Sequence, residues 1–417
     1  MIIRNLVKCN SCKETQWLRI DRPELKKDTY LYSCPTCSTE VFIDTKKTSK
    51  GISVESDECE IIDFDEYHNE EQPTGMVTLS SHYPVFTDVH HKELLEGGSP
   101  KLYYFSRDIH GAKKYDDVIT FFSLIKEHMY GEHSRVLNAL ESGNLGLVRD
   151  ILSTSKFGGS SDILKANDAQ LIYEVYSYLS VIFFTSLEID DRQKVYSEYY
   201  DELNNCIDKN LVKYSELLKD FHHKHEYLEN RSKLFNLHKR LFRQVESYMA
   251  GFIYEYASDD FKNDIDKCRL YRADFDTVKS LYVDIFELIS KTSIYIVLIT
   301  NLSKRGDVNL FSNSSMTVSK FKKLTSFKKL QFLSELPLVS SLFQSVSRKM
   351  RNEIGHFSAR YDVKSGNVVF DSGKTENYLI FLNNLLQAIK ALKIVYTVYS
   401  KVDLDIVQCK SLTKASR

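Results

Sequence analysis

Two pairs of cysteines near the start of the chain constrain its fold more than any other feature. Each pair has the form Cys-x2-Cys, and about 20 residues separate Cys9-x2-Cys12 from Cys34-x2-Cys37. Four cysteines with this spacing are typical of a structural zinc site in which every ligand is a thiolate. A redox motif instead occurs as a single pair that opens a helix. We therefore predict that these four cysteines bind one structural zinc ion, which takes no part in catalysis.

The residues around these cysteines predict a small β module, a zinc ribbon, over residues 1–48. Residues 15–20, 29–32 and 40–43 are β-prone and lie between and after the cysteine pairs. The module has few apolar residues, so we expect its folding to depend on the metal, whose binding supplies about 10–16 kcal/mol in comparable sites. The other four cysteines are isolated, and we predict that they are free thiols: Cys59, Cys206, Cys268 and Cys409.

An acidic segment follows the ribbon. Between Glu55 and Glu71 the chain carries nine carboxylates, and Pro73 and Gly75 come shortly afterwards. We expect an acidic linker or irregular insert over residues 49–112. Such a segment is either a solvated connector or a flap that covers a basic groove elsewhere in the chain, and its sequence does not decide between the two.

The rest of the chain is predicted to be mainly helical. Among 417 residues there are only 15 Gly and 6 Pro, against 26 Tyr and 24 Phe, which favours long helices over many short strands. Apolar residues recur at helical spacing from about Tyr115 onward. This predicts a helical domain over residues 113–264 and a compact helical bundle over residues 265–417.

Membrane insertion and export are not expected. The apolar stretch 176–187 is shorter than the roughly 20 residues that span a bilayer, and Glu287 and Lys291 interrupt the stretch 285–302. No signal peptide precedes the first cysteine pair. We predict a cytoplasmic protein without a membrane partner. The net charge of -1 shows no overall basic excess, so a surface for nucleic acid has to be local.

The bundle has a definite predicted order of elements. Periodicity predicts helices over residues 275–302 and 318–333, a third helix from Pro337 to Ile354, and a final helix over 378–399. Residues 361–370 predict a β-hairpin around Ser-Gly-Asn, between the third helix and the last. The fold class is therefore mainly α, with an N-terminal β module, a helical middle region and a C-terminal bundle that includes a short β-hairpin.

The run Arg351-Asn352-Glu353-Ile354-Gly355-His356 holds the candidate catalytic groups. Asn352 and His356 share one face of a helix because they are four positions apart. Arginine binds phosphate and stays charged, and histidine transfers protons near neutral pH. Eight basic residues and one acidic residue, Glu335, lie between positions 320 and 351. The alternative interpretation is a helix end with a histidine favoured by the helix dipole and a surface arginine.

This run resembles the Arg-Asn-x3-His form of the Arg-x4-6-His motif of HEPN domains, whose name marks proteins of higher eukaryotes and prokaryotes that bind nucleotides. The predicted order of helices and hairpin over about the last 140 residues is similar to that family as well. The resemblance implies a HEPN-like four-helix bundle that forms a homodimer. It also implies a metal-independent endoribonuclease acting as a toxin or as an anti-phage defence effector, with RNA such as tRNA as substrate and a phage or host protein as trigger.

Carried over to this chain, His356 is the acid or base and Arg351 stabilises charge on the phosphate in the transition state. Asn352 orients the phosphate or the imidazole. The expected products carry a 2′,3′-cyclic phosphate and a 5′-hydroxyl. Further candidates for binding the substrate are Lys322, Lys323, Arg348, Lys349 and Tyr361. Because other members of the family have lost activity, the alternative function is a non-catalytic module that binds nucleic acid or protein.

Overall fold

The structure of the chain is a computed structural model. It describes residues 2–21, 27–49, 51–63, 73–80, 82–87, 98–155, 163–180, 191–272, 274–336, 339–346, 354 and 359–415, and the structural statements below concern these residues. The chain forms two compact units. Unit 1 takes residues 1–119, 247–279 and 352–383, and unit 2 takes residues 120–246, 280–351 and 384–417.

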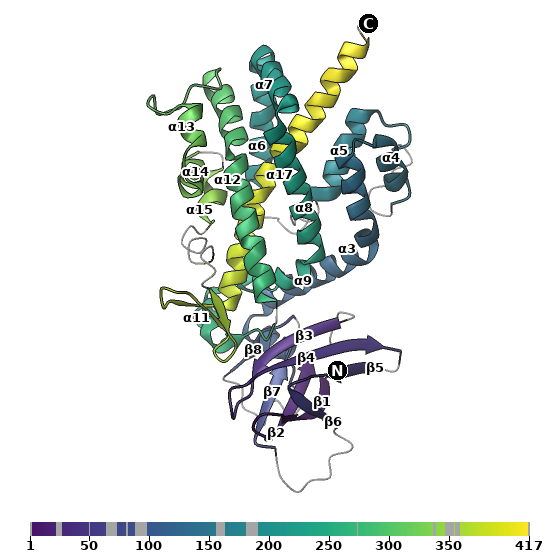
Figure 1. The fold of residues 1–417 in the computed structure, drawn as a ribbon, viewed down its shortest axis with the longest axis vertical. Helices are drawn as coiled ribbons and strands as arrows, with labels where there is room; N and C mark the ends of the chain where they lie inside the picture. The colour runs from purple at the N-terminus through teal and green to yellow at the C-terminus, as the bar shows by residue number, and fades with distance from the viewer. Residues whose placement is uncertain are drawn as a thin grey trace. The chain divides into compact units, whose positions relative to one another are not determined.

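Unit 1 begins with two small β-sheets (Figure 1). The first has the strand order β6-β1-β2-β7, with β1 antiparallel to β2 and β6, and β7 parallel to β2. The second has the order β3-β4-β5 and is antiparallel throughout. The strands are β1 (Ile2–Cys9), β2 (Thr15–Asp21), β3 (Lys27–Ser33), β4 (Glu40–Thr48), β5 (Gly51–Glu55), β6 (Cys59–Asp63) and β7 (Gly75–Leu79).

The three β-prone runs of the ribbon are confirmed as β2, β3 and β4. Residues 51–86, in the stretch expected to be a linker or irregular insert, contribute four further strands, β5 to β8. Strand β6 starts inside the acidic segment, where Cys59 is buried and lies opposite Cys9 of β1. The β module therefore continues beyond residue 48, and one core includes Val7, Leu18 and Val41 from the first four strands together with Val77 and Leu79 from β7.

The remainder of unit 1 combines short helices with two further small sheets. Strand β8 (Val85–Phe86) pairs with β9 (Cys268–Arg269), and β10 (Arg360–Asp362), β11 (Asn367–Val369) and β12 (Thr375–Asn377) form an antiparallel sheet. The predicted hairpin is confirmed, because β10 and β11 pair around Gly366, whose φ of 72° suits glycine. The short helices are α2 (Pro100–Arg107), α10 (Gly251–Tyr256), α11 (Asp259–Asn263) and η3 (Ile265–Lys267).

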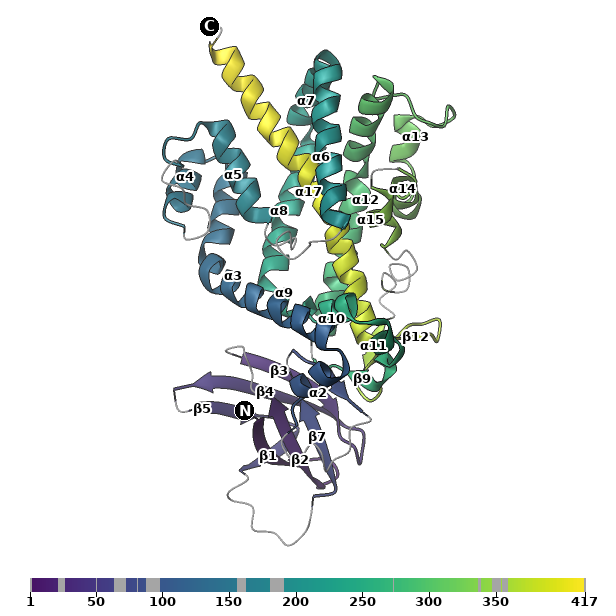
Figure 2. The same ribbon diagram turned by 180° about the vertical axis from the view of Figure 1, so that it is seen from behind.

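Unit 2 is helical, and its last helix, α17, lies between α8 and α12 in both views (Figures 1 and 2). The ring of Tyr399 on α17 lies 4.7 Å from the Tyr227 ring of α8 and 5.9 Å from the Tyr295 ring of α12. The helices that lie wholly in this unit are α4 (Leu145–Ser153), α5 (Asp168–Ser180), α6 (Asp191–Lys209), α7 (Leu211–His223), α8 (His225–Arg243), α13 (Val318–Lys322), α14 (Ser326–Leu333) and α15 (Ser340–Gln344).

Among the described helices, four contribute residues to both units. They are α3 (Ile109–Glu141), α9 (Val245–Tyr248), α12 (Phe275–Arg305) and α17 (Tyr378–Ala415). The predicted helices over residues 275–302 and 378–399 are confirmed as parts of α12 and α17.

The predicted helix over residues 318–333 is wrong in one respect, because two helices occupy it. Helix α13 ends at Lys322, and the hydroxyl of Thr325 accepts a hydrogen bond from the backbone amide of Lys328, which starts α14. Threonine is a favoured N-cap residue, and its side chain replaces the missing helical hydrogen bond. The predicted third helix is described only in part, as α15, since Pro337 and residues 347–353 lie outside the described residues.

Within the described part of the chain, one helix is long and apolar enough to cross a membrane, namely residues Tyr378–Gln408 of α17. Inside the structure 83% of its most apolar stretch is buried, which is the behaviour of a core helix in a soluble protein. Its charged residues are also satisfied within the protein: Lys393 lies over the Tyr196 ring and Lys401 pairs with Asp405. A cytoplasmic location stays a prediction.

Candidate functional site

The four cysteines lie on two tight turns that join antiparallel strands. The first turn runs from Cys9, the last residue of β1, to Cys12, shortly before β2. The second runs from Cys34, directly after β3, to Cys37, shortly before β4. We call these turns the first and the second knuckle.

The two knuckles have the same backbone hydrogen bonds. In the first, the amide of Cys9 donates to the carbonyl of Glu14 (3.0 Å) and the amide of Lys13 donates to the carbonyl of Cys9 (2.9 Å). In the second, the amide of Cys34 donates to Thr39 (2.8 Å) and the amide of Ser38 donates to Cys34 (2.9 Å). Residues in the left-handed region complete both turns.

Lys13 and Ser38 occupy this region, with φ values of 63° and 62°. Each follows the second cysteine of its knuckle. Positive φ is uncommon for residues other than glycine. Its occurrence at equivalent positions, without glycine, indicates that both turns are held in one geometry that brings the two sulfur atoms of each pair together.

The sulfur atoms have the spacing of metal ligands. All four ligand atoms lie within 4.8 Å of one another, with Cys9 Sγ 3.7 Å from Cys37 Sγ and Cys12 Sγ 3.8 Å from Cys34 Sγ. A tetrahedral ion with metal–sulfur bonds of about 2.3 Å places its ligands about 3.8 Å apart. A disulfide would need about 2.0 Å. The four thiols therefore can hold a metal ion such as zinc.

Polar neighbours support this cluster. The side-chain amide of Gln16 donates to Cys34 Sγ over 3.1 Å, and both groups are buried. Hydrogen bonds with the side chain and the backbone of Thr39 lower the pKa of Cys37 to about 6, which favours the thiolate that binds metals. Such contacts orient the ligands of a metal and stabilise their charge.

Gln16 and Thr39 are not among the residues that the sequence predicts for this site. A signal for Gln16 exists, because it shares one face of β2 with the buried Leu18 and Ile20. A polar residue on an apolar strand face needs a polar partner in the interior. Here that partner is a metal-ligating cysteine.

Most of the predicted catalytic segment lies outside the described residues. This applies to Arg351, Asn352, His356, Arg348 and Lys349. Within Arg351–His356 only Ile354 is described, and it is helical and buried. Their predicted roles therefore stay predictions.

The other predicted substrate-binding residues are described, and they belong to different units. Lys322 and Lys323, at the end of α13 in unit 2, are exposed, and the Lys322 ammonium group lies 3.6 Å from the Glu226 carboxylate. Tyr361 belongs to β10 in unit 1, where its hydroxyl donates to the carbonyl of Leu270. Burial raises the pKa of Tyr361 far above its ordinary value. Tyr361 therefore lies in the environment of a residue that packs inside the protein.

No family model, curated protein or solved structure matches this chain. The similarity to HEPN domains therefore rests on the Arg351–His356 motif and on the predicted order of elements. Of that order, the described residues contain α12, α13, α14, α15, the β10–β11 hairpin and α17. The metal centre, in contrast, rests on the geometry of described side chains.

Proposed function

We propose that this chain is a metal-independent endoribonuclease of the HEPN type, whose N-terminal cysteines hold a structural zinc ion. One observation carries the catalytic part, namely the sequence Arg351-Asn352-x3-His356. Its place in the order of elements supports the proposal, because it follows α15 and precedes the hairpin of β10 and β11.

In the proposed reaction the 2′-hydroxyl of RNA attacks the adjacent phosphorus and the 5′-oxygen leaves. His356 transfers the proton, either from the attacking hydroxyl or to the leaving oxygen, which contributes roughly 10²–10⁴ in rate. Arg351 stabilises the added negative charge on the phosphate, and Asn352 orients the reacting groups. DNA, which lacks the 2′-hydroxyl, should resist cleavage. As the resemblance implies, two copies of the chain bring two motifs together in a homodimer.

Exposed lysines of α13 and α14, which precede the motif in the sequence, support an RNA substrate. The side chains of four lysines on and between α13 and α14 are exposed: Lys320, Lys322, Lys323 and Lys328. Phosphate backbones bind such surfaces by releasing counterions, without regard to sequence. The Lys322–Glu226 pair is exposed on both sides, so it weakens this attraction only slightly.

Zinc is the metal we propose for the cysteine cluster because soft thiolates in a tetrahedral set select it. Four protein ligands leave no open position for a substrate or an activated water molecule. The role of the ion is therefore to hold the knuckles together, and we assign no step of the reaction to it.

The test compares four single variants with the wild-type full-length protein. His356→Ala and Arg351→Ala remove the proposed catalytic groups. His110→Ala and Arg135→Ala are matched controls, because both are exposed residues of α3. Purified tRNA and total RNA are incubated without added divalent metal, and the ends of the products are analysed for cyclic phosphate.

We expect the wild type and both controls to cleave RNA, and both motif variants to lose nearly all activity. Substrate with a 2′-deoxy residue at the cleaved position should stay intact. If the wild type binds RNA but does not cut it, and the motif variants bind equally well, the chain is a non-catalytic binding module instead. Light scattering on the same samples tests the homodimer.

A further inference from the structure

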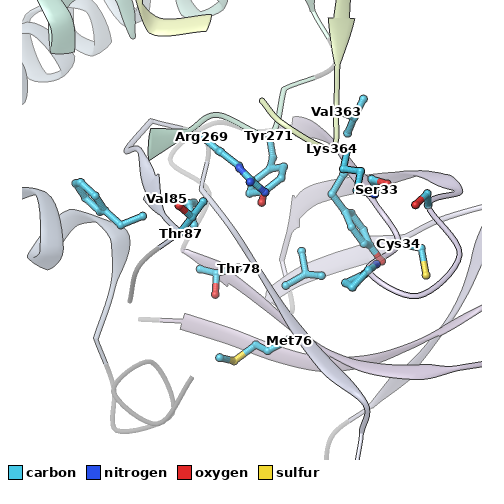
Figure 3. Close-up of a pocket in the computed structure, with 15 residues that line it drawn as sticks. Ser33, Cys34, Met76, Thr78, Val85, Thr87, Arg269, Tyr271, Val363 and Lys364 are labelled. Carbon is cyan, nitrogen blue, oxygen red and sulfur yellow. The ribbon is translucent and has the colours of Figure 1, made fainter. Parts of the chain in front are cut away.

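A cavity of about 350 Å³ lies in unit 1 beside the second knuckle (Figure 3). Its lining comes from β3, the second knuckle, β7, the paired strands β8 and β9, and the turn between β10 and β11. Small-molecule sites usually measure about 300–1,000 Å³, so this cavity has room for one small ligand.

Two basic side chains, Arg269 and Lys364, belong to the lining of this cavity. The described lining residues include no carboxylate, and Cys34 is the metal-ligating thiol among them. Among the described residues, neither basic side chain has a carboxylate within ion-pair distance. The hydroxyl groups of Ser33 and Thr78, which can give hydrogen bonds to a ligand, also line the cavity. The cavity is therefore suited to an anion.

Arg269 also has an unused hydrogen-bond donor. Its Nε is buried and has no acceptor in the described structure. A buried donor without a partner costs about 1–3 kcal/mol, and structures usually satisfy such groups. The hydrogen-bonding capacity of Arg269 is therefore not fully used within the described structure.

The position of Arg269 is fixed before any ligand binds. Its backbone pairs with Val85 in the two-stranded sheet of β8 and β9. Its aliphatic part packs against Gly366, where an added Cβ would lie 2.9 Å from Arg269 Cγ. Because Gly366 has no side chain, this point of the β10–β11 turn leaves room for the aliphatic part of Arg269. A guanidinium group that is already positioned loses less entropy on binding a ligand.

A third cation contacts a residue that lines the cavity. Arg19 of β2 is buried, and its guanidinium group donates to the hydroxyl of Thr78 (3.4 Å) and to the carbonyl of Gly98 (2.7 Å). Thr78 itself lines the cavity. Arginine stays charged even when it is buried, so it adds to the positive potential that a bound anion experiences.

Aromatic side chains lie beside these cations. Tyr271 lies next to Arg269 in the close-up, and Tyr32 and Phe86 also belong to the lining (Figure 3). Aromatic surfaces stack on the flat faces of nucleic-acid bases, while arginine and lysine bind phosphate. Together, the two kinds of group suit a ligand with a flat ring and a phosphate.

We propose that this cavity binds a phosphorylated ligand the size of one nucleotide. Arg269 and Lys364 contact its phosphate, and its ring lies against Tyr271. This chemistry is shared by a free mononucleotide and by the phosphorylated end of a nucleic-acid strand. The residues proposed to contact the ligand are not those of the Arg351–His356 motif, and the proposed binding does not depend on ribonuclease activity.

The test measures binding to the full-length, zinc-loaded protein by titration calorimetry. The probes are the four nucleoside 5′-monophosphates, adenosine without phosphate, inorganic phosphate, and short DNA strands with and without a 5′-phosphate. DNA is used because ribonuclease chemistry does not cut it.

Two variants remove the proposed charged contacts while keeping an unbranched polar side chain, Arg269→Gln and Lys364→Gln. The matched controls are Arg360→Gln on β10 and Lys46→Gln on β4, both of which are exposed and outside the cavity lining. Lys364 is itself exposed on a turn, so its replacement leaves folding intact even if Arg269→Gln does not. Zinc content and thermal unfolding verify that each variant is folded.

We expect at least one mononucleotide to bind, and adenosine to bind much more weakly. Arg269→Gln should weaken binding about tenfold or more, and Lys364→Gln several-fold, as lost charge-assisted hydrogen bonds do. Both controls should bind like the wild type. Preference for the phosphorylated DNA strand, with the same sensitivity to Arg269 and Lys364, supports the site and identifies a strand end as the ligand.

Two results would overturn the proposal. One is a wild type that binds neither mononucleotides nor phosphorylated strands at millimolar concentration. The other is binding that Arg269→Gln and Lys364→Gln leave unchanged, which would place the ligand elsewhere. Because the readout is binding alone, a failure here is distinct from a failure of the proposed ribonuclease activity.

Discussion

The sulfur atoms of Cys9 and Cys37 lie 3.7 Å apart although the two cysteines are 28 positions apart in the chain. Cys12 and Cys34 make the second such approach, at 3.8 Å. Each close pair joins one knuckle to the other. A metal at this point therefore links the β1–β2 hairpin to the β3–β4 hairpin, and so links the two sheets of the β module.

The first prediction concerns this metal. Cys12→Ser and Cys37→Ser should each reduce bound zinc from one ion per chain to well below one, as measured by elemental analysis, and should lower the melting temperature of the protein. The physical reason is that structural zinc binding contributes about 10–16 kcal/mol to folding. Cys59→Ala is the control, because Cys59 is buried in the same core but lies outside the four-cysteine cluster. Equal zinc loss in the control would contradict the assignment of ligands.

The second prediction concerns a buried ion pair in unit 2. The Asp403 carboxylate accepts hydrogen bonds from Arg231 (3.0 Å), Tyr176 (2.6 Å) and Tyr227 (3.3 Å). Asp403→Ala leaves two buried hydroxyls and the guanidinium group of Arg231, whose side chain is 22% exposed, without this acceptor. Removing one partner of a buried pair costs about 3–5 kcal/mol. Urea denaturation should show a loss of that size.

The matched control for this prediction is an exposed ion pair on α8. Lys233 and Glu229 are four positions apart, and their side chains are 47% and 50% exposed. Lys233→Ala should change the free energy of unfolding by less than about 1 kcal/mol, because solvent screens the pair. Comparable losses in the two variants would mean that burial does not set the strength of the Asp403 interactions.

The third prediction is a loss of stability in mild acid. Nε2 of His133 lies 3.0 Å from Nδ1 of His238, and both side chains are buried. Burial, followed by the charge of Lys239, lowers the pKa of His133 to about 3. Burial, followed by His133, lowers the pKa of His238 well below its ordinary value, although its bond to the Leu179 backbone acts in the opposite direction.

The direction of this pH effect follows from the protonation of the two histidines in the folded and the unfolded protein. In the unfolded chain both histidines take up protons as the pH falls below about 6.5, whereas in the folded protein they stay neutral until a much lower pH. The free energy of unfolding should therefore decrease as the pH falls from 6.5 to 5, the window above most carboxylate titrations. Chemical denaturation at stepped pH measures this slope. His133→Gln should reduce the slope, and His225→Gln, an exposed residue of α8, should leave it unchanged.

The fourth prediction concerns the lysines of α13 and α14. Replacing Lys320, Lys322, Lys323 and Lys328 with glutamine should weaken RNA binding and make it less dependent on salt. Each lost phosphate contact reduces the slope of log affinity against log salt by about 0.7 for a single strand. Filter binding at several salt concentrations gives the slope. A control with four exposed lysines changed elsewhere, at positions 46, 113, 165 and 219, should keep the wild-type slope.

Features set by neighbouring residues were predictable from the sequence, and features set by distant contacts were not. The Cys-x2-Cys pairs predicted their own turns because both ligands of each knuckle lie within four residues. The helical rhythm from Tyr378 to Tyr399 predicted that part of α17. In contrast, β7 pairs in parallel with β2, about 60 positions away, and no local sequence pattern identifies β2 as its partner strand. The break at Thr325 depends on one capping hydrogen bond, which the apolar periodicity of residues 318–333 does not reveal.

The candidate site residues also differ in whether local sequence or distant contacts determine their role. Cys9, Cys12, Cys34 and Cys37 were identified from spacing, and the described geometry brings them together. Arg269 was not identified, because its importance arises from Val85 in the next strand and from Gly366 about 100 positions later. The roles of Arg351 and His356 came from a resemblance and remain predictions.

Each compact unit is assembled from three separate stretches of the chain, interleaved with those of the other unit. Neither unit is therefore encoded by one continuous piece of a gene. A fragment covering residues 265–417 would carry Asp403 but lack Arg231, Tyr176 and Tyr227, which bond to it. A single recombination event cannot move either unit intact into another protein.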